Sequence, residues 1–137
     1  MSRPEIRAGL DTSVLMRLLT GQPAHLAEVA REYLAEVDQS GAVVHVSNLV
    51  VSEAYFACQH HYRMPKADVL AGLLTILSLP TFVVHPALLD LLATDGLAIA
   101  KPGFLDRLIH AEYAANALPL VSFEKAAAHL SGTHTLS

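Results

Sequence analysis

Four acidic residues, Asp11, Glu53, Asp106 and Glu124, stand where a strand should end or where a helix should begin. Carboxylate oxygens are the ligands that Mg²⁺ and Mn²⁺ prefer, and such an ion can activate water for attack on a phosphodiester. Taken singly, each acid could instead cap a helix or lie in its first turn, stabilised by backbone N–H groups and the helix dipole. Several acids brought to one edge repel each other unless a cation offsets their charge. The set therefore indicates a metal-dependent phosphoryl-transfer site.

Short apolar, β-branched segments alternate with amphipathic segments along the whole chain. This alternation predicts parallel strands joined by helices, and hence a three-layer α/β/α sandwich with a short parallel sheet, formed as a single domain over residues 1–137. Ligands of such sheets bind beyond the carboxyl ends of the strands, where the acids should lie. The strands are expected at residues 6–10, 42–46, 81–85 and 120–121, with a last edge strand at 133–136.

The helices that should carry the acids are set by apolar periodicity and by breaking residues. Thr12 or Ser13 is the expected N-cap of the first helix. The second should bury an apolar stripe formed by Leu26, Val29, Ala30, Tyr33, Leu34 and Val37. The helix at 66–79 is apolar nearly all round, which indicates burial by the core and by a partner. The expected helices are 14–19, 24–39, 49–62, 66–79, 86–100, 104–117 and 124–130.

Composition limits the classes of function. With 53% hydrophobic and 16% charged residues, the chain of 137 residues should fold around a real core. A formal charge of -4 argues against a broad basic face for nucleic acid, so any such contact must be local. Cys58 is the only cysteine, which excludes an internal disulfide and fits a reducing, cytoplasmic location. No segment resembles a signal peptide or a membrane span.

The order of four short segments resembles the PIN domain, and more narrowly the VapC-type ribonuclease toxins of bacterial toxin–antitoxin pairs. This resemblance implies a metal-dependent endoribonuclease that uses Mg²⁺ or Mn²⁺, hydrolyses phosphodiester bonds in a structured cellular RNA and is neutralised by a cognate VapB-like antitoxin. A homodimer is also expected. The segments are Leu10-Asp11-Thr12-Ser13, Val50-Val51-Ser52-Glu53, Phe104-Leu105-Asp106-Arg107 and Val121-Ser122-Phe123-Glu124.

The same resemblance assigns roles to individual residues. Asp11, Glu53 and Asp106 match the main metal-binding acids, and Glu124 would position a second metal or the attacking water. Members of the family commonly carry Thr-Phe-Asp where this chain has Ser122-Phe123-Glu124, so the acidic arm is longer here by one methylene. The supporting positions are Thr12, Ser13 and Ser122. Three basic residues could hold RNA phosphates or could be solvated helix charges: Arg17, Arg107 and Lys125.

Several alternatives stay open. The chain could be a non-catalytic PIN-like module whose acids dock a basic partner segment. Asp11-Thr12-Ser13-Val14 also resembles the phospho-acceptor loop of haloacid-dehalogenase-like phosphatases, although their second aspartate would fall at Ser13. No histidine lies in a zinc-binding pattern. His110 could orient a ligand carboxylate or could simply pack its helix.

Overall fold

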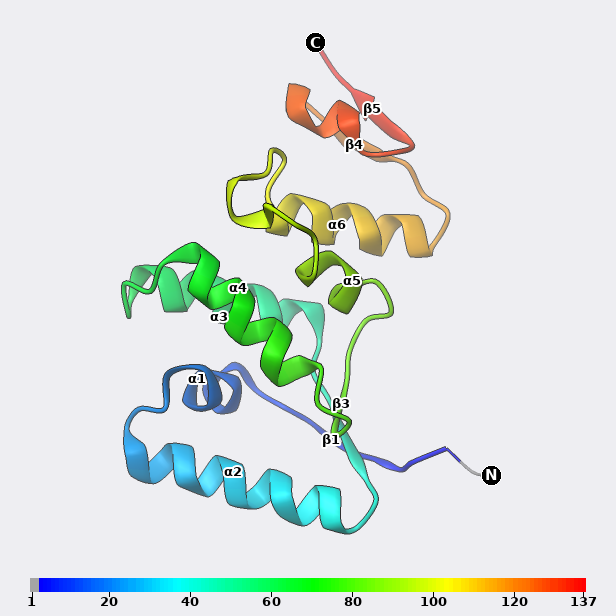
Figure 1. Ribbon diagram of the computed structural model, residues 1–137. Helices are drawn as coiled ribbons and strands as arrows, with labels where there is room; N and C mark the ends of the chain where they lie inside the picture. The colour runs from blue at the N-terminus through cyan, green and yellow to red at the C-terminus, as the bar shows by residue number, and fades with distance from the viewer. Residues whose placement is uncertain (1–2) are drawn as a thin grey trace. The chain divides into compact units, whose positions relative to one another are not determined.

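The computed structural model describes residues 3–137, which divide into two compact units. One unit extends to Leu89, and the other begins at Asp90 and ends at Ser137. Helices and parallel strands occur in both (Figure 1), so the α/β class predicted from the sequence is confirmed. None of the helices in this described part combines the length and apolar character needed to cross a membrane.

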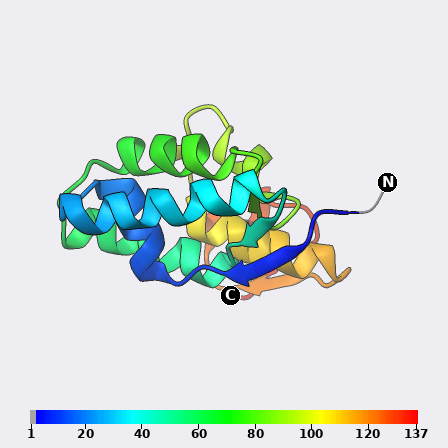
Figure 2. The same cartoon turned by 90° about the horizontal axis from the view of Figure 1, so that it is seen from below.

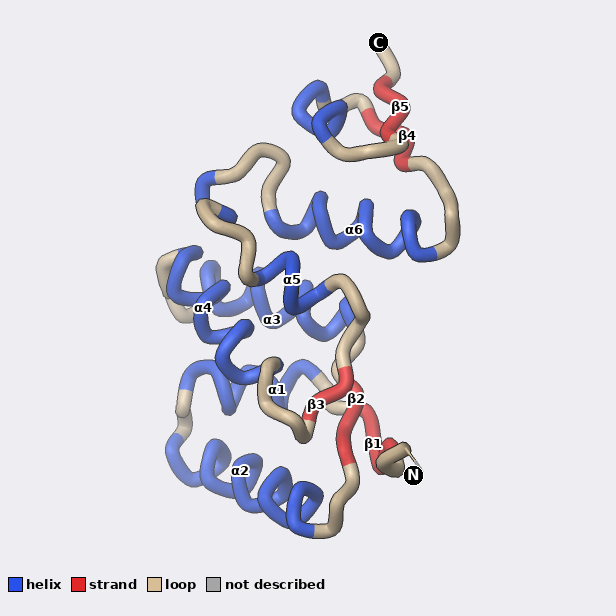
Figure 3. Tube along the Cα trace, turned by 45° about the vertical axis from the view of Figure 1, so that its right-hand side comes forward, coloured by secondary structure: helices blue, strands red, loops and turns tan. Residues whose placement is uncertain are grey.

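The first unit is built on a three-stranded parallel sheet with the order β1-β2-β3. Figures 2 and 3 show β1 and β2 side by side, with the chain passing from β1 into α1. The strands are short, and only β2 begins with consecutive β-branched residues. The elements are β1 (Ile6–Gly9), α1 (Thr12–Thr20), α2 (Ala24–Gln39), β2 (Val43–His45), α3 (Asn48–His60), α4 (Lys66–Leu77) and β3 (Phe82–Val83).

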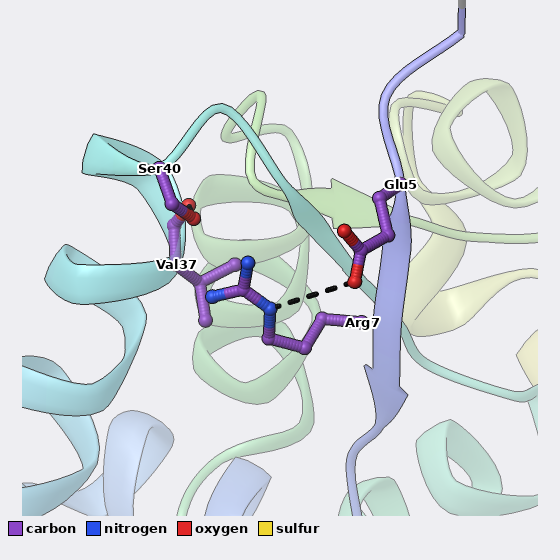
Figure 4. A network of polar contacts seen from close by, with 4 residues as sticks. All are labelled: Glu5, Arg7, Val37 and Ser40. Atoms are coloured by element: carbon purple, nitrogen blue, oxygen red, sulfur yellow. Dashed lines mark hydrogen bonds and ion pairs between the residues drawn. The ribbon is translucent and has the colours of Figure 1, made fainter.

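Strand β1 lies at one end of this sheet and is largely exposed. Arg7 is therefore tolerated in β1, whereas a strand covered on both faces would not favour an arginine. Figure 4 shows the Arg7 side chain between Glu5 and the C-terminal end of α2, with its Nε 3.8 Å from Glu5 Oε1. Both side chains are exposed, so this ion pair contributes little to stability.

The N-cap of helix α1 lies one residue before Thr12, the first of its two expected caps. Asp11 is the N-cap, whereas Thr12 and Ser13 lie inside the first turn, so the expectation that one of them caps the helix is wrong. The helix ends at Gly21, whose φ of 67° is left-handed and whose N–H donates to the carbonyl of Arg17 at 2.8 Å. The consequence is a helix that starts directly at the end of β1 with an acid.

Helix α2 has the predicted bounds, and its buried face overlaps the expected stripe only in part, at Ala30 and Val37. Its buried residues are Ala27, Ala30 and Val37, whereas Leu26, Val29 and Tyr33 are exposed by 44, 60 and 37%. Small alanines allow a helix to approach its neighbours closely, so the face that carries them packs inward against α1 and β2. Leu26, Val29 and Tyr33 are left on a surface.

Helices α1, α3 and α4 pack against each other and form most of the core of the first unit. A Cβ added at Gly72 of α4 would stand 3.3 Å from Leu19 Cδ2 of α1, so glycine permits the close approach of these helices. Leu15, Val51 and Leu73 are completely buried there. The all-round apolar character of α4 is thus largely explained by burial of Val69, Leu70, Leu73 and Leu77 within the chain.

Cys58 lies in this core and is completely buried, with its Sγ 3.7 Å from Met16 Sδ. Burial raises the pKa of the Cys58 thiol, which lowers the thiolate fraction near neutral pH. We expect alkylation of Cys58 by iodoacetamide at pH 8 to be on the order of a hundredfold slower in the folded chain than in urea. Mass spectrometry of the labelled chain measures both rates, and equal rates would contradict this burial.

The second unit contains α6 (Phe104–Ala115) and a two-stranded parallel sheet of β4 (Leu120–Ser122) and β5 (Thr133–Thr135). The predicted helix at 86–100 is wrong: α5 (Leu88–Leu92) and the 3₁₀ helix η1 (Leu97–Ile99) are separated by a turn at Thr94-Asp95-Gly96. Gly96 there has a left-handed φ of 71° that continuous helix does not allow. The predicted helix at 124–130 is likewise a short 3₁₀ helix, η2 (Lys125–His129).

Candidate functional site

Asp11 follows the carboxyl end of β1, where Leu10 N–H donates to the His45 carbonyl of β2 at 2.9 Å. The Asp11 carbonyl accepts hydrogen bonds from Val14 and Leu15 and so starts α1. Its side chain is exposed and makes no capping hydrogen bond. The structural alternative for this acid, a carboxylate that caps the helix, is therefore not realised.

The two polar residues beside Asp11 support it differently. Ser13 Oγ donates to Asp11 Oδ2 at 3.2 Å, which restricts the carboxylate without neutralising it. Thr12 Oγ1 is buried and lacks a hydrogen-bond partner within residues 3–137, an arrangement that costs free energy unless a further group satisfies it. Thr12 and Ser13, two of the three predicted supporting residues, thus lie next to Asp11 in the chain.

Glu53 lies on α3, which follows β2 and is capped by Ser47, whose Oγ accepts from Val50 N at 3.2 Å. Glu53 stands in the second turn of α3 with its side chain exposed. Because α1 and α3 pack together, Asp11 and Glu53 belong to neighbouring elements of the first unit.

A groove of about 750 Å³ opens beside Asp11. Apolar side chains form most of it. Its charged groups come from Asp11 and Arg17, and its hydroxyl groups from Ser13 and Tyr33. The groove therefore places a carboxylate and a guanidinium beyond the carboxyl end of β1, where open α/β sheets bind ligands. Its lining residues are Ala8, Gly9, Leu10, Asp11, Ser13, Val14 and Arg17, with Leu26, Val29, Ala30 and Tyr33 from α2.

Arg17 links this groove to the end of α3. One of its Nη atoms donates to the Tyr62 hydroxyl at 3.4 Å. The guanidinium has four further N–H donors and is in no ion pair within residues 3–137. Its use as an RNA-binding residue stays a prediction, but no Asp or Glu within residues 3–137 neutralises its charge in an ion pair.

Asp106 is the acid of the first turn of α6, as predicted, and it is exposed. Phe104 and Leu108 on either side of it are buried and fix the face of the helix that carries it. Arg107, a predicted RNA contact, donates from Nε to the Pro102 carbonyl at 2.7 Å. That bond ties α6 to the loop before it and gives Arg107 a structural role.

Glu124 is held at the end of β4 by a local turn. Its N–H donates to Ser122 Oγ at 2.9 Å, and its carbonyl accepts from Ala127 at the start of η2. The Glu124 side chain is exposed and makes no capping hydrogen bond. Ser122, a predicted supporting residue, thus positions the backbone of Glu124, while Lys125 is exposed beside it.

His110 has a structural partner. Its Nε2 lies 2.6 Å from the Ser131 carbonyl oxygen, and because a carbonyl only accepts, Nε2 carries the proton. The contact joins α6 to the loop between η2 and β5. Of the two interpretations of His110, helix packing is the one that this hydrogen bond favours.

The four acids share one property: in the described part of the chain none is in an ion pair with Lys or Arg. All are exposed, and the two at N-cap positions leave their caps unmade. Asp11 and Glu53 belong to one unit, and Asp106 and Glu124 to the other. No group of three or more His, Cys, Asp or Glu side chains within residues 3–137 is arranged to hold a metal ion. That all four acids gather at one site stays a prediction.

The chemistry of the donors nevertheless suits a hard divalent cation. Carboxylate and hydroxyl oxygens are the preferred ligands of Mg²⁺, and a ligand carboxylate must be deprotonated and not already neutralised. Asp11 supplies such an oxygen: its carboxylate is exposed, is in no ion pair within residues 3–137, and is next in sequence to Thr12, whose buried hydroxyl has no partner there. The residues present around Asp11 therefore fit the implied ion.

Three further residues, Tyr62, Phe56 and His60, are not predicted by the sequence patterns described above. Tyr62 holds Arg17, and Phe56 and His60 of α3 form an exposed stacked pair with ring centroids 4.0 Å apart. A helical projection of residues 48–60 could have found the pair, because its rings lie four residues apart and away from the buried positions Val51, Tyr55 and Cys58.

Of the comparisons with known proteins, the one with protein families finds a match. The PIN domain family matches the chain over residues 9–132, a span that includes all four acids and most of each unit. No curated protein and no solved structure matches the chain. The family match, the helices and the short parallel sheets together confirm the predicted PIN-like α/β/α fold class.

Proposed function

The chain belongs to the PIN domain family, whose members are in general metal-dependent nucleases, and we propose that it is a metal-dependent endoribonuclease of the VapC-like toxin type. The observation that carries this proposal is Asp11: its carboxylate is exposed at the end of β1, accepts a hydrogen bond from Ser13 and makes no capping hydrogen bond to α1. An acid kept available at a strand's carboxyl end serves ligand binding better than it serves stability.

In this proposal Asp11, Glu53 and Asp106 hold Mg²⁺ or Mn²⁺. A bound ion supplies positive charge that offsets the charge developing on the phosphate and makes water a better nucleophile. Glu124, fixed by its bond to Ser122, orients the attacking water or a second ion. The units that carry these acids act together as one domain over residues 1–137, which the single family match across both units supports.

We propose a structured cellular RNA as the substrate. Arg17 and Lys125 are the basic residues that could contact its phosphates, while Arg107 contributes mainly to the shape of its own loop. The net charge of -4 favours a few local contacts over a broad basic face. Selectivity would then come from the shape of the RNA and from unpaired bases.

We also propose a VapB-like antitoxin and a second copy of the chain as partners. The groove beside Asp11 supports the antitoxin, because exposed Leu26, Val29 and Tyr33 offer an apolar surface next to the catalytic acid. An apolar segment seated there would cover Asp11 and so inhibit the enzyme.

The second candidate function is a non-catalytic PIN-like binding module. Its supporting observation is the same apolar groove, which could serve a partner without any reaction. In such a protein the acids would bind a basic segment and would have no need of a divalent ion.

Calorimetric titration with Mn²⁺ separates these functions. The endoribonuclease binds Mn²⁺, and Asp11→Asn loses that binding while its circular dichroism spectrum stays unchanged. The same preparation should cleave RNA with Mg²⁺ or Mn²⁺ and stop when EDTA is added. A folded chain that neither binds Mn²⁺ nor cleaves RNA would favour the binding module.

A further inference from the structure

Helix α3 carries an exposed stripe formed by Leu49, Glu53, Phe56 and His60. Their spacing of four, three and four residues puts them on one face of the helix. Leu49 is 71% and Phe56 54% exposed, although the opposite face of α3 is completely buried at Val51. The core of the protein therefore does not explain why a phenylalanine occurs at this position, beside the acid proposed as a metal ligand.

Phe56 and His60 form a ready-made aromatic surface. Their ring centroids are 4.0 Å apart with an interplanar angle of 34°. Proteins that bind single-stranded RNA stack unpaired bases on exposed Phe, Tyr, Trp and His rings. A leucine or valine would cover apolar surface equally well but would offer no ring face to a base.

The segment that follows this aromatic pair is basic. Residues 54–67 contain no Asp or Glu, whereas Arg63 and Lys66 are exposed there. Arg17 adds a third cation through its hydrogen bond to Tyr62. In a chain with a net charge of -4, such a run is a local exception, and it suits phosphate groups.

From these observations we infer that α3 is a binding surface for one unpaired strand of the RNA substrate. One base stacks on Phe56 and His60, the phosphates on one side of it contact Arg63 and Lys66, and the phosphate on the other side is brought to Glu53. With a rise of 1.5 Å per residue, Glu53 lies about 4 Å from Phe56 and about 10 Å from His60 along the helix axis. The inference rests on the proposed ribonuclease function and adds to it the residues that place the substrate.

The test measures binding separately from cleavage. A short fluorescein-labelled single-stranded RNA of mixed sequence is titrated with the full chain in EDTA, and fluorescence anisotropy gives the dissociation constant. Phe56→Leu, which keeps apolar bulk and removes the ring, should weaken binding about tenfold. Phe56→Tyr should restore it. Leu49→Ala is the matched control, because it shortens an exposed apolar residue of the same stripe, and it should change binding less than about twofold.

With Mg²⁺ or Mn²⁺ added, Phe56→Leu should raise KM for RNA cleavage and leave kcat nearly unchanged. If the wild-type chain binds no RNA, or if Phe56→Leu binds as tightly as the wild type, the inference is overturned. If Leu49→Ala and Phe56→Leu both reduce the mass measured by light scattering and neither affects RNA binding, the stripe is a protein interface and the inference also fails. Ring-dependent RNA binding by a wild-type chain that cleaves nothing would support this surface while refuting the nuclease proposal.

Discussion

Replacing Asp11 or Asp106 with asparagine is expected to slow Mg²⁺- or Mn²⁺-dependent RNA cleavage by about a hundredfold or more. Residues that only support a metal ligand already cost 10- to 100-fold when they are changed, so loss of a direct ligand should cost at least as much. Asparagine keeps the size of the side chain and removes its charge. Neither carboxylate caps a helix through its side chain or forms an ion pair in residues 3–137, so the fold should survive. Initial rates of RNA cleavage at saturating metal measure the effect.

Matched controls are available in each unit. Glu36→Gln changes an exposed acid of α2, and Asp90→Asn changes an exposed first-turn acid of α5, as Asp106 is of α6. Both should retain near wild-type activity. Full activity in Asp11→Asn and Asp106→Asn alike would refute the proposed enzyme.

Glu124 should give a smaller effect. Its carboxylate arm is one methylene longer than the aspartate that resembling proteins carry, and its proposed role is to orient water or a second ion. Glu124→Gln should therefore lower the rate by about 10- to 100-fold. A loss greater than that of Asp106→Asn would make Glu124 a principal ligand.

The second large effect is on stability. Leu73 of α4 is completely buried, and truncation of such a leucine removes apolar contacts and leaves a cavity. Leu73→Ala is expected to lower the free energy of unfolding by about 2–5 kcal/mol. Urea unfolding followed by far-ultraviolet circular dichroism gives this value.

Cys58 offers an independent measure of the same change. It lies in the same unit as Leu73, and its labelling rate reports openings of that core. Leu73→Ala should speed alkylation of Cys58. Leu79→Ala, at a position that is 53% exposed, should leave the free energy of unfolding within about 0.5 kcal/mol of the wild type and the labelling rate nearly unchanged. Equal stability of the two variants would contradict the described core.

Local periodicity predicted most elements well, because a helix or strand depends mainly on residues close in sequence. The helix at 24–39 has its predicted bounds, and the breaks at Gly21 and Gly41 are both left-handed glycines. The error at 86–100 was also local: Thr94-Asp95-Gly96 is a turn signal that an apolar pattern concealed.

Side-chain partners could not be predicted in this way. The contacts of Arg17 with Tyr62 and of His110 with Ser131 join residues 45 and 21 positions apart. Nothing in the composition of either helix reveals them, because they depend on how the intervening elements fold back. The same holds for α2, where Ala27 faces inward while Leu26 and Val29 of the expected stripe do not.

The sequence alone determined the order of the elements, the α/β class and the position of each acid at a strand end or on the helix that follows. Those properties come from periodicity, turn residues and the alternation of strands with helices, all readable over short windows. Only the tertiary structure decided that Asp11 caps α1 without using its carboxylate, that α2 leaves an apolar groove beside it, and that Phe56 and His60 stack in the open. Which face of a helix is covered depends on packing against elements distant in the chain, and no local pattern contains that information.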